Sequence, residues 1–442
     1  MPSCEYRKVE AGQLSNSIKP KLLILTSSFP DHPMDETCGY LRDFARAMSE
    51  TFCVTVLAPP ALAQIEWPDD AFYLHRSPSI VPRKWNPFLA SRDVSDLSKR
   101  SLWVRLVALF GVLVFAARAV GLARQTDAIC SHWMVPAGLI GAWLSSVLKK
   151  PQVVIEHSGA LHGLQSLRGG RRLAQFIADH SHQMVFVSRD LVMKFRRLCP
   201  QTTAPIDVLP MGITDQPATE TTEKEVAAER IILFIGRLVE IKGVEVLLRA
   251  VARMQIPDVR VVIAGDGEQR ANLEAFAAHS NRKVQFVGQV DAAEKARLLR
   301  ACAVVVIPSL RLASGRTEGT PVVCLEALRA GKPIIASRVG GLGELITDGW
   351  NGVLFDAGDA QMLAEKLDAL IADRAGQQRL AVNAKLSARN YGWSLIGAQF
   401  AKILLQAIRS ESPMLRNRFD EVVQSAQSRP SKRPVRSAQP HS

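Results

Sequence analysis

Glu318 and Glu326 stand eight residues apart around the start of a helical segment, in the sequence SGRTEGTPVVCLEALRAG. Pro321, near the first turn, and Gly331, just past the last, are residues that commonly open and end a helix. At roughly 1.5 Å per residue, the two carboxylates would lie about 12 Å apart along the helix axis. Unrelated glutamates at this spacing more often solvate a helix, but the separation also suits two carboxylates that bind opposite ends of one elongated ligand.

The backbone amides that open the same helix form a second chemical feature. The positions from Gly319 through Thr320 and Pro321 to Val322 include amide donors with no acceptor inside the helix, at the positive end of its dipole. Such a helix start is a natural binding site for a phosphate or for a developing negative charge. We therefore predict that an elongated ligand places its phosphates here, between the two glutamates.

This stretch resembles glycosyltransferase family 4, whose members carry the pattern E-G-x-P-x-x-x-x-E-A-x-x-x-G. Here Glu318, Gly319, Pro321 and Glu326 fill its first positions. Other segments are similar to the family in the same order, from about residue 20 to residue 410, and most strongly in the second half. These segments are TSSFPDHPMDETCG (26–39), LPMGI (209–213), IILFIGRLVEIKGVEVLL (231–248), VVIAGDGE (261–268), QFVGQV (285–290) and VVIPS (305–309).

The resemblance implies how a donor substrate is bound. The donor would be a nucleotide diphosphate sugar, with Glu318 contacting hydroxyls of the sugar and Glu326 contacting the ribose. Arg237 and Lys242, in the segment GRLVEIKG, are implied to bind the diphosphate. Fixed positive charge at that place would stabilise the leaving group in a reaction that uses no metal.

On the acceptor side the resemblance is looser. Gly39, which opens a helix after the first strand, is implied to approach the donor, although many relatives have two adjacent glycines where this sequence has Cys38 and Gly39. His157 follows Glu156 at the end of a strand, where the family often has a histidine close to the donor sugar. A lone histidine is more often structural, and His132, which ends another strand, is the weaker candidate.

The two glutamates also bear on stereochemistry. Retention by double displacement needs two carboxyl groups about 5 Å apart, roughly half the separation expected for Glu318 and Glu326. We therefore expect both to bind the donor. The acceptor hydroxyl would attack the face from which the diphosphate leaves, and a phosphate oxygen would take the proton. The anomeric configuration would be retained.

Several signatures are missing from the sequence. It has no Asp-x-Asp, the usual manganese-binding signature of the other large glycosyltransferase fold, no P-loop, and no G-x-G-x-x-G near its start. We therefore expect no metal and no cofactor beyond the nucleotide sugar that serves as co-substrate. Kinase and dehydrogenase activities lose support for the same reason.

Short apolar runs alternate with amphipathic stretches from Lys21 onward, the pattern of doubly wound α/β domains. The helix expected over residues 39–50 has its apolar side chains on one face, as a helix packed on a sheet should: Leu41, Phe44, Ala45 and Met48. The expected parallel strands are 21–28, 52–58, 126–132, 152–157 and 184–188, followed by 230–237, 259–265, 284–287, 303–308 and 332–337.

Two domains follow from these two sets of strands, and the resemblance implies a GT-B architecture, in which two Rossmann-like domains face a central cleft. We predict a flexible N-terminal segment, an acceptor-side domain, a linker rich in Thr and Glu, a nucleotide-sugar-binding domain, a helix crossing back to the first domain and a basic disordered tail. These parts are residues 1–19, 20–213, 214–229, 230–392, 393–412 and 413–442, respectively.

The composition limits the partners. The 442-residue chain is 47% hydrophobic and 22% charged, as a folded protein is, and its formal net charge is +13. That charge favours an anionic partner, which could be a nucleotide diphosphate, an acidic lipid surface or a nucleic acid. Nucleic acid is the least favoured, because no binding motif or interleaved aromatic residues accompany the basic residues. We expect none to bind.

Three features bear on location. The polar first twenty residues lack the apolar stretch of a secretory signal, and the seven cysteines have no metal-ligand or Cys-x-x-Cys spacing, so we expect a cytoplasmic protein. The apolar run 106–117 has only twelve residues between Arg105 and Arg118, short of the roughly 20 that cross a bilayer. We expect a helix buried between a sheet and its neighbours. The same run, together with Arg168, Arg171, Arg172 and the basic residues of 429–436, also leaves open a peripheral contact with an anionic membrane.

The preferred hypothesis is a retaining hexosyltransferase that acts on a UDP- or GDP-sugar and on a glycan or lipid-linked acceptor, in cell-surface polysaccharide or glycolipid biosynthesis. A nucleotide-sugar epimerase or hydrolase of the same architecture is the alternative, although the sequence offers no acid/base set for it. A non-enzymatic nucleic-acid-binding protein is the third.

Overall fold

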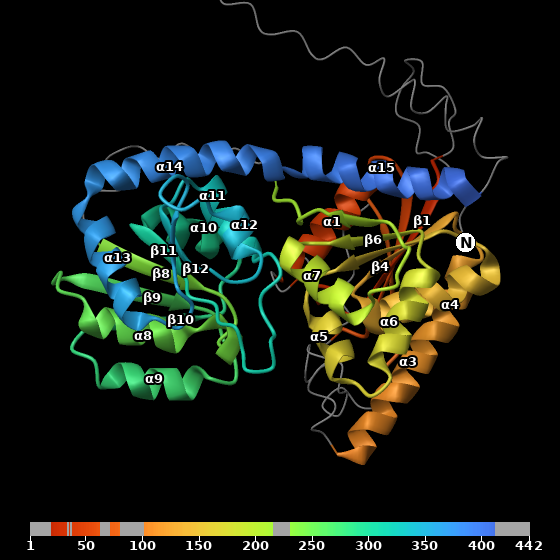
Figure 1. Cartoon of the computed structure of the whole chain (residues 1–442), viewed down its shortest axis with the longest axis horizontal. Helices are drawn as coiled ribbons and strands as arrows, with labels where there is room; N and C mark the ends of the chain where they lie inside the picture. The colour runs from red at the N-terminus through yellow and green to blue at the C-terminus, as the bar shows by residue number, and fades with distance from the viewer. Residues whose placement is uncertain are drawn as a thin grey trace, which may run out of the picture.

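The computed structural model describes residues 19–32, 35, 38–61, 71–79, 101–214 and 230–411. Two α/β domains lie side by side in Figure 1, and two long helices near the C-terminus run along one edge of both. Each domain has its own parallel sheet. The predicted fold class, two doubly wound α/β domains, is therefore confirmed.

The first sheet has the strand order β3-β2-β1-β4-β5-β6-β7, and all its neighbouring strands are parallel. Its central strands are buried almost throughout, as strands covered on both faces must be. The strands are β1 (Lys21–Thr26), β2 (Cys53–Ala58), β3 (Tyr73–Arg76), β4 (Ala128–His132), β5 (Gln152–Glu156), β6 (Gln183–Phe186) and β7 (Ile206–Val208).

The second sheet has the order β10-β9-β8-β11-β12-β13 and is also parallel. Two separate apolar clusters fill its two faces. Its strands are β8 (Arg230–Ile235), β9 (Val259–Ala264), β10 (Lys283–Gly288), β11 (Val304–Ile307), β12 (Ile334–Ser337) and β13 (Val353–Phe355).

Both sheets reverse their strand order at a central pair. β1 lies between β2 and β4, and β8 lies between β9 and β11. Doubly wound sheets bind ligands outside the carboxyl ends of strands at such a switch point. The segments that follow β1, β4, β8 and β11 are therefore the places where a site is expected.

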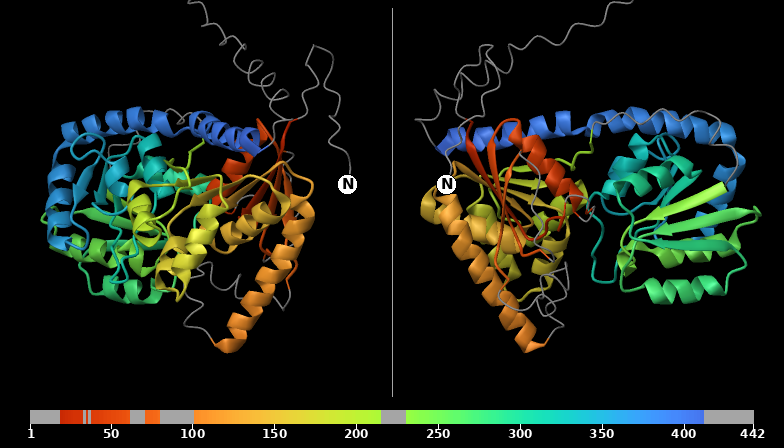
Figure 2. Two further views of the ribbon diagram at one scale, coloured as in Figure 1. Left: turned by 45° about the vertical axis from the view of Figure 1, so that its right-hand side comes forward. Right: turned by 180° about the vertical axis from the view of Figure 1, so that it is seen from behind.

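Helices cover both faces of each sheet (Figure 2). In the first domain α1 buries Leu41, Phe44, Ala45 and Met48, the face that the sequence predicted. The helices of this domain are α1 (Gly39–Ser49), α3 (Leu102–Ala123), the π-helical turn η3 (Met134–Gly138), α4 (Leu139–Leu148), α5 (Gly159–Ser166), α6 (Gly170–Asp179) and α7 (Arg189–Leu198).

The helices of the second domain follow the same alternation with its strands. They are η5 (Glu240–Lys242), α8 (Val244–Arg253), α9 (Arg270–Ala278), α10 (Ala292–Ala301), α11 (Val322–Arg329), α12 (Leu342–Leu345), α13 (Ala360–Ala372), α14 (Arg374–Ala388) and η6 (Arg389–Tyr391).

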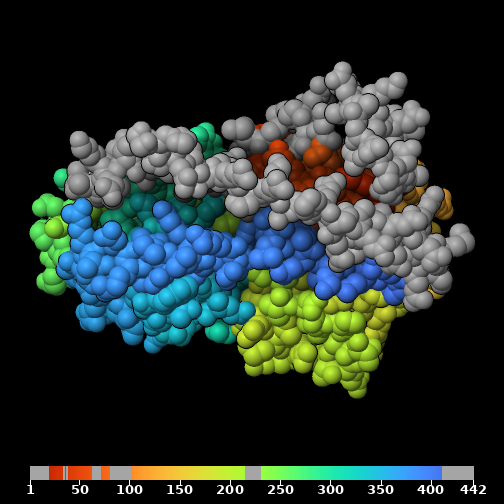
Figure 3. Space-filling model, turned by 90° about the horizontal axis from the view of Figure 1, so that it is seen from above, coloured from red at the N-terminus to blue at the C-terminus, as the bar shows by residue number. Residues whose placement is uncertain are grey.

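The last helix, α15 (Trp393–Glu411), packs on the first domain although it follows the second along the chain. It lies against α1, and the rings of Trp393 and Phe400 contact Phe44 with centroids 6.1 and 5.2 Å away. Figure 3 shows α14 and α15 as one blue band across both domains. The band ties the two domains together.

Some predictions concern residues outside the described ones. The N-terminal segment 1–18, residues 215–229 of the predicted linker and the tail from residue 412 all fall there. The strands β3, β7 and β13 were absent from the predicted set because they are only three or four residues long. β3 and β7 are also partly exposed, whereas β13 is apolar but too short to stand out in the sequence.

The helix α3 corrects the sequence analysis. The expectation of a short helix buried between a sheet and its neighbours is wrong, because α3 spans 22 residues and much of its first half faces solvent. By length and apolar composition α3 could cross a membrane, and it is the one helix among the described residues that could. The run appeared short because Arg105 and Arg118 interrupt it, yet both arginines lie within the helix.

Candidate active site

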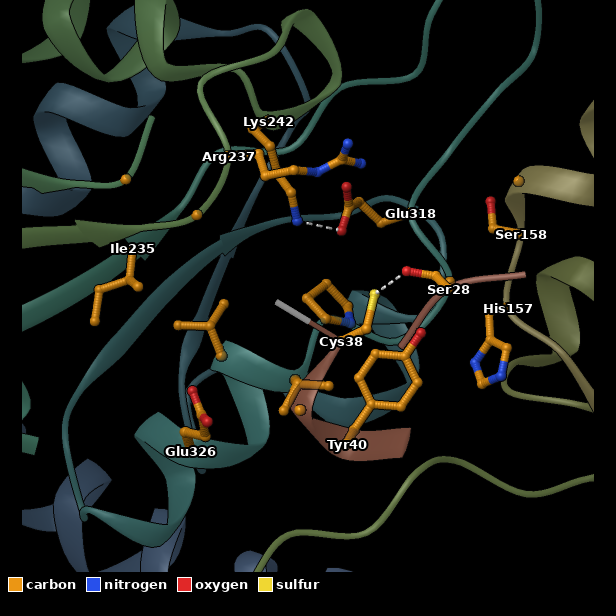
Figure 4. Close-up of a pocket in the computed structure, with 18 of the residues that line it drawn as sticks. Ser28, Cys38, Tyr40, His157, Ser158, Ile235, Arg237, Lys242, Glu318 and Glu326 are labelled. Carbon is orange, nitrogen blue, oxygen red and sulfur yellow. Dashed lines mark hydrogen bonds and ion pairs between the residues drawn. The ribbon is translucent and has the colours of Figure 1, made fainter. Parts of the chain in front are cut away.

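A cavity of about 630 Å³ lies between the two domains, at the switch points of both sheets. Residues from both domains line it (Figure 4). Of the predicted site residues, the cavity brings together Gly39, His157, Arg237, Lys242, Glu318, Gly319, Pro321, Val322 and Glu326. Thr320, the remaining one, turns its hydroxyl to the Val187 carbonyl of the first domain at 2.5 Å. The roles predicted for these residues stay predictions.

The first charged group of the cleft is a partly buried ion pair. Lys242 Nζ lies 2.7 Å from Glu318 Oε2, and the two side chains are only 17% and 12% exposed. Lys242 ends the 3-10 turn η5 after β8, and Glu318 ends the loop after β11, so adjacent strands of one sheet deliver them. The Arg237 guanidinium extends beside the pair (Figure 4) and forms no ion pair among the described residues. The group therefore holds one more positive charge than negative, which suits a diphosphate.

A second partly buried ion pair also lines the cleft. Lys295 Nζ of α10 lies 2.7 Å from Glu326 Oε1, and each side chain is 15% exposed. The sequence analysis missed Lys295, because its partner is 31 residues away and nothing local marks it. The lysine occupies one carboxylate oxygen of Glu326. The second oxygen can accept a hydroxyl, such as that of a ribose.

The helix α11 begins as the sequence predicted. Pro321 is its N-cap, and Gly331 follows its C-cap in the left-handed conformation with φ +63°. The amides of Val322 and Val323 stand in the first turn, where the helix supplies no acceptor, and both residues line the cavity. A phosphate placed here would meet these donors between the two ion pairs.

Gly319 lies at a tight contact between the two domains. A Cβ atom at this position would lie 2.5 Å from the carbonyl oxygen of His157, so no larger residue fits without a shift of the backbone. Ser158 also donates its hydroxyl to the Thr317 carbonyl at 2.6 Å, across the same boundary. The loop with Glu318 is thus pressed against the end of β5.

A further contact between the domains caps a helix. The carboxylate of Glu344, in the second domain, accepts the Arg189 and Asp190 amides at the start of α7 at 2.9 and 3.1 Å. A carboxylate stabilises the positive end of a helix dipole. Thr317 reaches the same region, donating to Asp190 at 2.8 Å. These contacts hold the cleft in a closed arrangement.

The wall of the first domain is built from aromatic rings and histidines. His132 Nδ1 and His157 Nε2 form a hydrogen bond of 2.9 Å, with their rings stacked at 5.2 Å. The ring of Tyr40, next to Gly39 at the start of α1, lies 5.3 Å from that of His157. Burial lowers the pKa of His157 to about 3 and lowers that of His132 well below its ordinary value. Both are neutral near pH 7.

Glu156 shapes the turn that presents His157. Its carboxylate is fully buried and accepts amides of Met134, Ser158 and Leu161 at 2.9, 2.8 and 3.3 Å. Burial raises its pKa, and the amide hydrogen bonds oppose that shift. Ser158 has φ +119°, which a serine rarely adopts. The network supports this bend and directs the His157 ring into the cleft.

Gly39 and Cys38 lie at the start of a helix, as the sequence predicted. Gly39 opens α1, and Cys38 is its N-cap in the left-handed conformation with φ +58°. Ser28 donates its hydroxyl to the Cys38 sulfur at 3.2 Å (Figure 4). Two adjacent glycines would adopt this left-handed turn easily, and here Cys38 adopts it instead. Gly39 therefore still lies at the cleft.

No three His, Cys, Asp or Glu side chains gather as around a metal ion in the described part of the chain. Metal independence stays a prediction. Arg237, Lys242 and Lys295 supply positive charge to the cleft.

Residues 216–387, which hold both ion pairs, match the family model of the glycosyl transferases group 1. The chain therefore carries a group 1 glycosyltransferase domain. It is 28% identical over 268 residues to an uncharacterised glycosyltransferase of Methanocaldococcus jannaschii, covering 60% of this transferase and 72% of that protein. It is 27% identical over 347 residues to the D-inositol 3-phosphate glycosyltransferase of Corynebacterium diphtheriae, covering 72% and 78%.

The transferase also shares its fold with solved structures. Anabaena HepE in complex with UDP-glucose superposes with a TM-score of 0.65 at 21% identity, over 88% of this transferase and 100% of that chain. At this identity the likeness shows the GT-B fold alone. The predicted architecture of the transferase is thereby confirmed.

Proposed function

We propose that this group 1 glycosyltransferase is a retaining, metal-independent enzyme of family 4 that moves a hexose from a UDP- or GDP-sugar to a glycan or lipid-linked acceptor. The observation that carries the proposal is the order of groups along the cleft. First comes the ion pair of Glu318 and Lys242, with Arg237 beside it. The start of α11 follows, and then the ion pair of Glu326 and Lys295. Sugar, diphosphate and ribose follow in the same order in a nucleotide sugar.

Each residue has a task in this mechanism. Arg237 and Lys242 stabilise the charge that grows on the leaving diphosphate, as do the first amides of α11. Glu318 accepts hydrogen bonds from sugar hydroxyls and orients the ring, while Glu326 holds the ribose. The neutral His157 offers a hydrogen bond to the sugar without adding charge. The acceptor hydroxyl attacks from the side of the leaving diphosphate, and a phosphate oxygen takes its proton.

Lys242 links binding to chemistry. In the structure it neutralises Glu318, and an entering diphosphate competes for the same ammonium group. As Lys242 turns toward the diphosphate, Glu318 is released to bind the sugar hydroxyls. Binding of the diphosphate therefore frees Glu318 to bind the sugar. A complete nucleotide sugar is favoured over a ligand that fills only part of the cleft.

The donor assignment is supported by the HepE structure, which holds UDP-glucose in the same fold. The acceptor is assigned to cell-surface polysaccharide or glycolipid biosynthesis, and the enzyme to the cytoplasm, in peripheral contact with an anionic membrane. The net charge of +13 is consistent with such a surface. Nucleic acid is not assigned as a partner.

The deciding experiment is a panel of UDP- and GDP-sugars tested by thermal shift. The cognate donor at about 100 times its Kd should stabilise the protein by about 2.7 kcal/mol. Turnover is then measured with and without EDTA, and the product anomer is determined by NMR. Turnover lost with EDTA refutes metal independence, and an inverted product refutes retention. Donor consumption that needs no acceptor would instead favour a nucleotide-sugar hydrolase or epimerase.

A further inference from the structure

The first half of α3 carries an apolar stripe that nothing in the described structure covers. Six large side chains are more than half exposed: Leu102 71%, Trp103 61%, Leu106 51%, Leu109 58%, Phe110 56% and Leu113 58%. At about 100° per residue, they fall within an arc of roughly 120° of the helix surface. A soluble monomer rarely leaves so large a contiguous apolar surface without a binding function.

The opposite side of α3 is anchored in the protein. Phe115, Ala119 and Leu122 are buried with Leu23 and Leu57 of the sheet. The helix also packs against α4. In Figures 1 and 2 the start of α3 projects beyond the body of the first domain, while its end lies at the sheet. The stripe is therefore held at a fixed place on the outside of the molecule.

We propose that this stripe inserts into the surface of an anionic lipid bilayer, and that α3 is the membrane anchor of the enzyme. The inference rests on the proposed function in one respect: transfer to a lipid-linked acceptor is the reason the enzyme would need to bind a membrane. The partner is identified by two further observations, the distribution of charge and the length of the free part of the helix.

Charge around α3 matches a negative surface. Between residues 102 and 178 the sequence has eight Lys or Arg residues and only two acidic ones, Asp127 and Glu156. Glu156 is buried, and Asp127 accepts the Lys21 amide. On the helical projection, Arg105 and Arg118 fall on opposite flanks of the apolar arc, by about 100° per residue. Such flanking arginines reach toward headgroups while the apolar face enters the acyl region.

The geometry favours a helix lying in the surface over one crossing the membrane. The exposed stripe ends at Leu113, because Phe115, Ala119, Leu122 and Ala123 further along the helix belong to the core. Twelve residues extend about 18 Å, whereas the hydrocarbon core is about 30 Å thick. The strands β3 and β4 on either side of α3 belong to the same sheet. Both ends of the helix therefore stay on one side of the bilayer.

The test is sedimentation of the full chain with vesicles of phosphatidylcholine alone or mixed with phosphatidylglycerol. We expect binding to the mixed vesicles, and a loss of about tenfold or more in partitioning for the double variant Leu109→Glu, Phe110→Glu. The matched control is Val382→Glu, Leu386→Glu, which changes two exposed apolar side chains of α14 (55% and 43%) in the second domain. It should bind like the wild type.

A second measurement reports insertion directly. Trp103 fluorescence should be quenched by lipids brominated in the acyl chains, and Trp103→Phe should remove that share of the quenching. Equal partitioning of the wild type and the α3 variant, or no quenching from Trp103, overturns the proposal. A dimer that the α3 variant abolishes, without vesicle binding, also overturns it and assigns the stripe to a second copy.

Donor binding separates this inference from the proposed function. The α3 and control variants should both keep the thermal shift given by the cognate UDP- or GDP-sugar, because the stripe lies outside the cleft residues. Vesicle binding lost with donor binding kept would confirm the role of α3. Donor binding absent from the wild type would refute the proposed function whatever the vesicles show.

Discussion

The two walls of the cleft use different chemistry. The second domain contributes the charged groups, Lys242 with Glu318 and Lys295 with Glu326. The first domain contributes rings that are neutral near pH 7, with His157 stacked on His132. One wall can therefore bind and stabilise charge, while the other can form hydrogen bonds to a sugar without competing for the diphosphate.

The largest effect should come from the charged wall. In the proposed mechanism Arg237→Ala and Lys242→Ala each remove fixed charge beside the leaving diphosphate, so each should raise the barrier by about 2 to 4 kcal/mol. The measurement is kcat/KM for the cognate donor, with circular dichroism as the control for folding. Unchanged kinetics in both variants would show that the diphosphate binds elsewhere.

The two glutamates should separate chemistry from binding. Glu318→Gln should lower kcat by about tenfold or more, since this side chain orients the reacting sugar, whereas Glu326→Gln should mainly raise the donor KM. Steady-state kinetics of both variants with the same donor distinguish the two effects. A glycosyl adduct trapped on Glu318, or equal effects of both changes on kcat, would contradict this division.

The contact between the walls can be tested at Gly319. Gly319→Ala places a Cβ atom 2.5 Å from the His157 carbonyl oxygen, so the walls must move apart. We expect kcat to fall by about tenfold to a hundredfold, because small displacements of reacting groups are costly. Gly343→Ala is the matched control, since nothing lies within 4 Å of a Cβ at that glycine. Similar rates for the two variants would contradict a closed catalytic arrangement.

Lys295 should have a smaller effect. Lys295→Met removes the partner of Glu326 while keeping the length of the side chain. We expect the donor KM to rise by about tenfold with kcat nearly unchanged, because the pair lies at the ribose end of the proposed site. The double variant with Glu326→Gln should then add little. Additive effects of the two changes would mean that the residues act separately.

The neutral state of His157 should be visible in how the stability of the protein depends on pH. The folded pKa of His157 is about 3, below the unfolded value of about 6.5. The unfolded state therefore binds more protons in this window, so stability is full above about pH 6.5 and falls as the pH drops toward 3. The melting temperature of wild type should fall several degrees more across this range than that of His157→Gln. Parallel pH curves would contradict burial of a neutral His157.

The sequence predicted the charged wall better than the neutral one. Glu318, Glu326 and the α11 boundaries belong to one continuous segment whose turn and helix signals are local. The ion pair of Lys295 and the ring contact of Tyr40 with His157 depend on strands and helices that only the fold brings together. Local signals cannot show such contacts, which is why these two residues were missed.

The fold class was predictable because each buried parallel strand is an apolar run of its own. The error at α3 has a different cause. A count of uncharged residues ends at Arg105 and Arg118, yet arginine side chains are long enough to leave an apolar helix surface without interrupting the helix. The composition of α3 could not predict its burial either, because an apolar helix has the same composition whether a sheet or a lipid covers it.

The return of α15 to the first domain has a consequence for synthesis of the chain. Phe44 and Met48 of α1 are fully buried, and Trp393 and Phe400 pack on Phe44. These covering side chains belong to the last described helix, so they leave the ribosome after the whole second domain. During translation the apolar face of α1 therefore stays without the cover of α15 until the second domain has been synthesised. Its core closes only once the second domain is already complete.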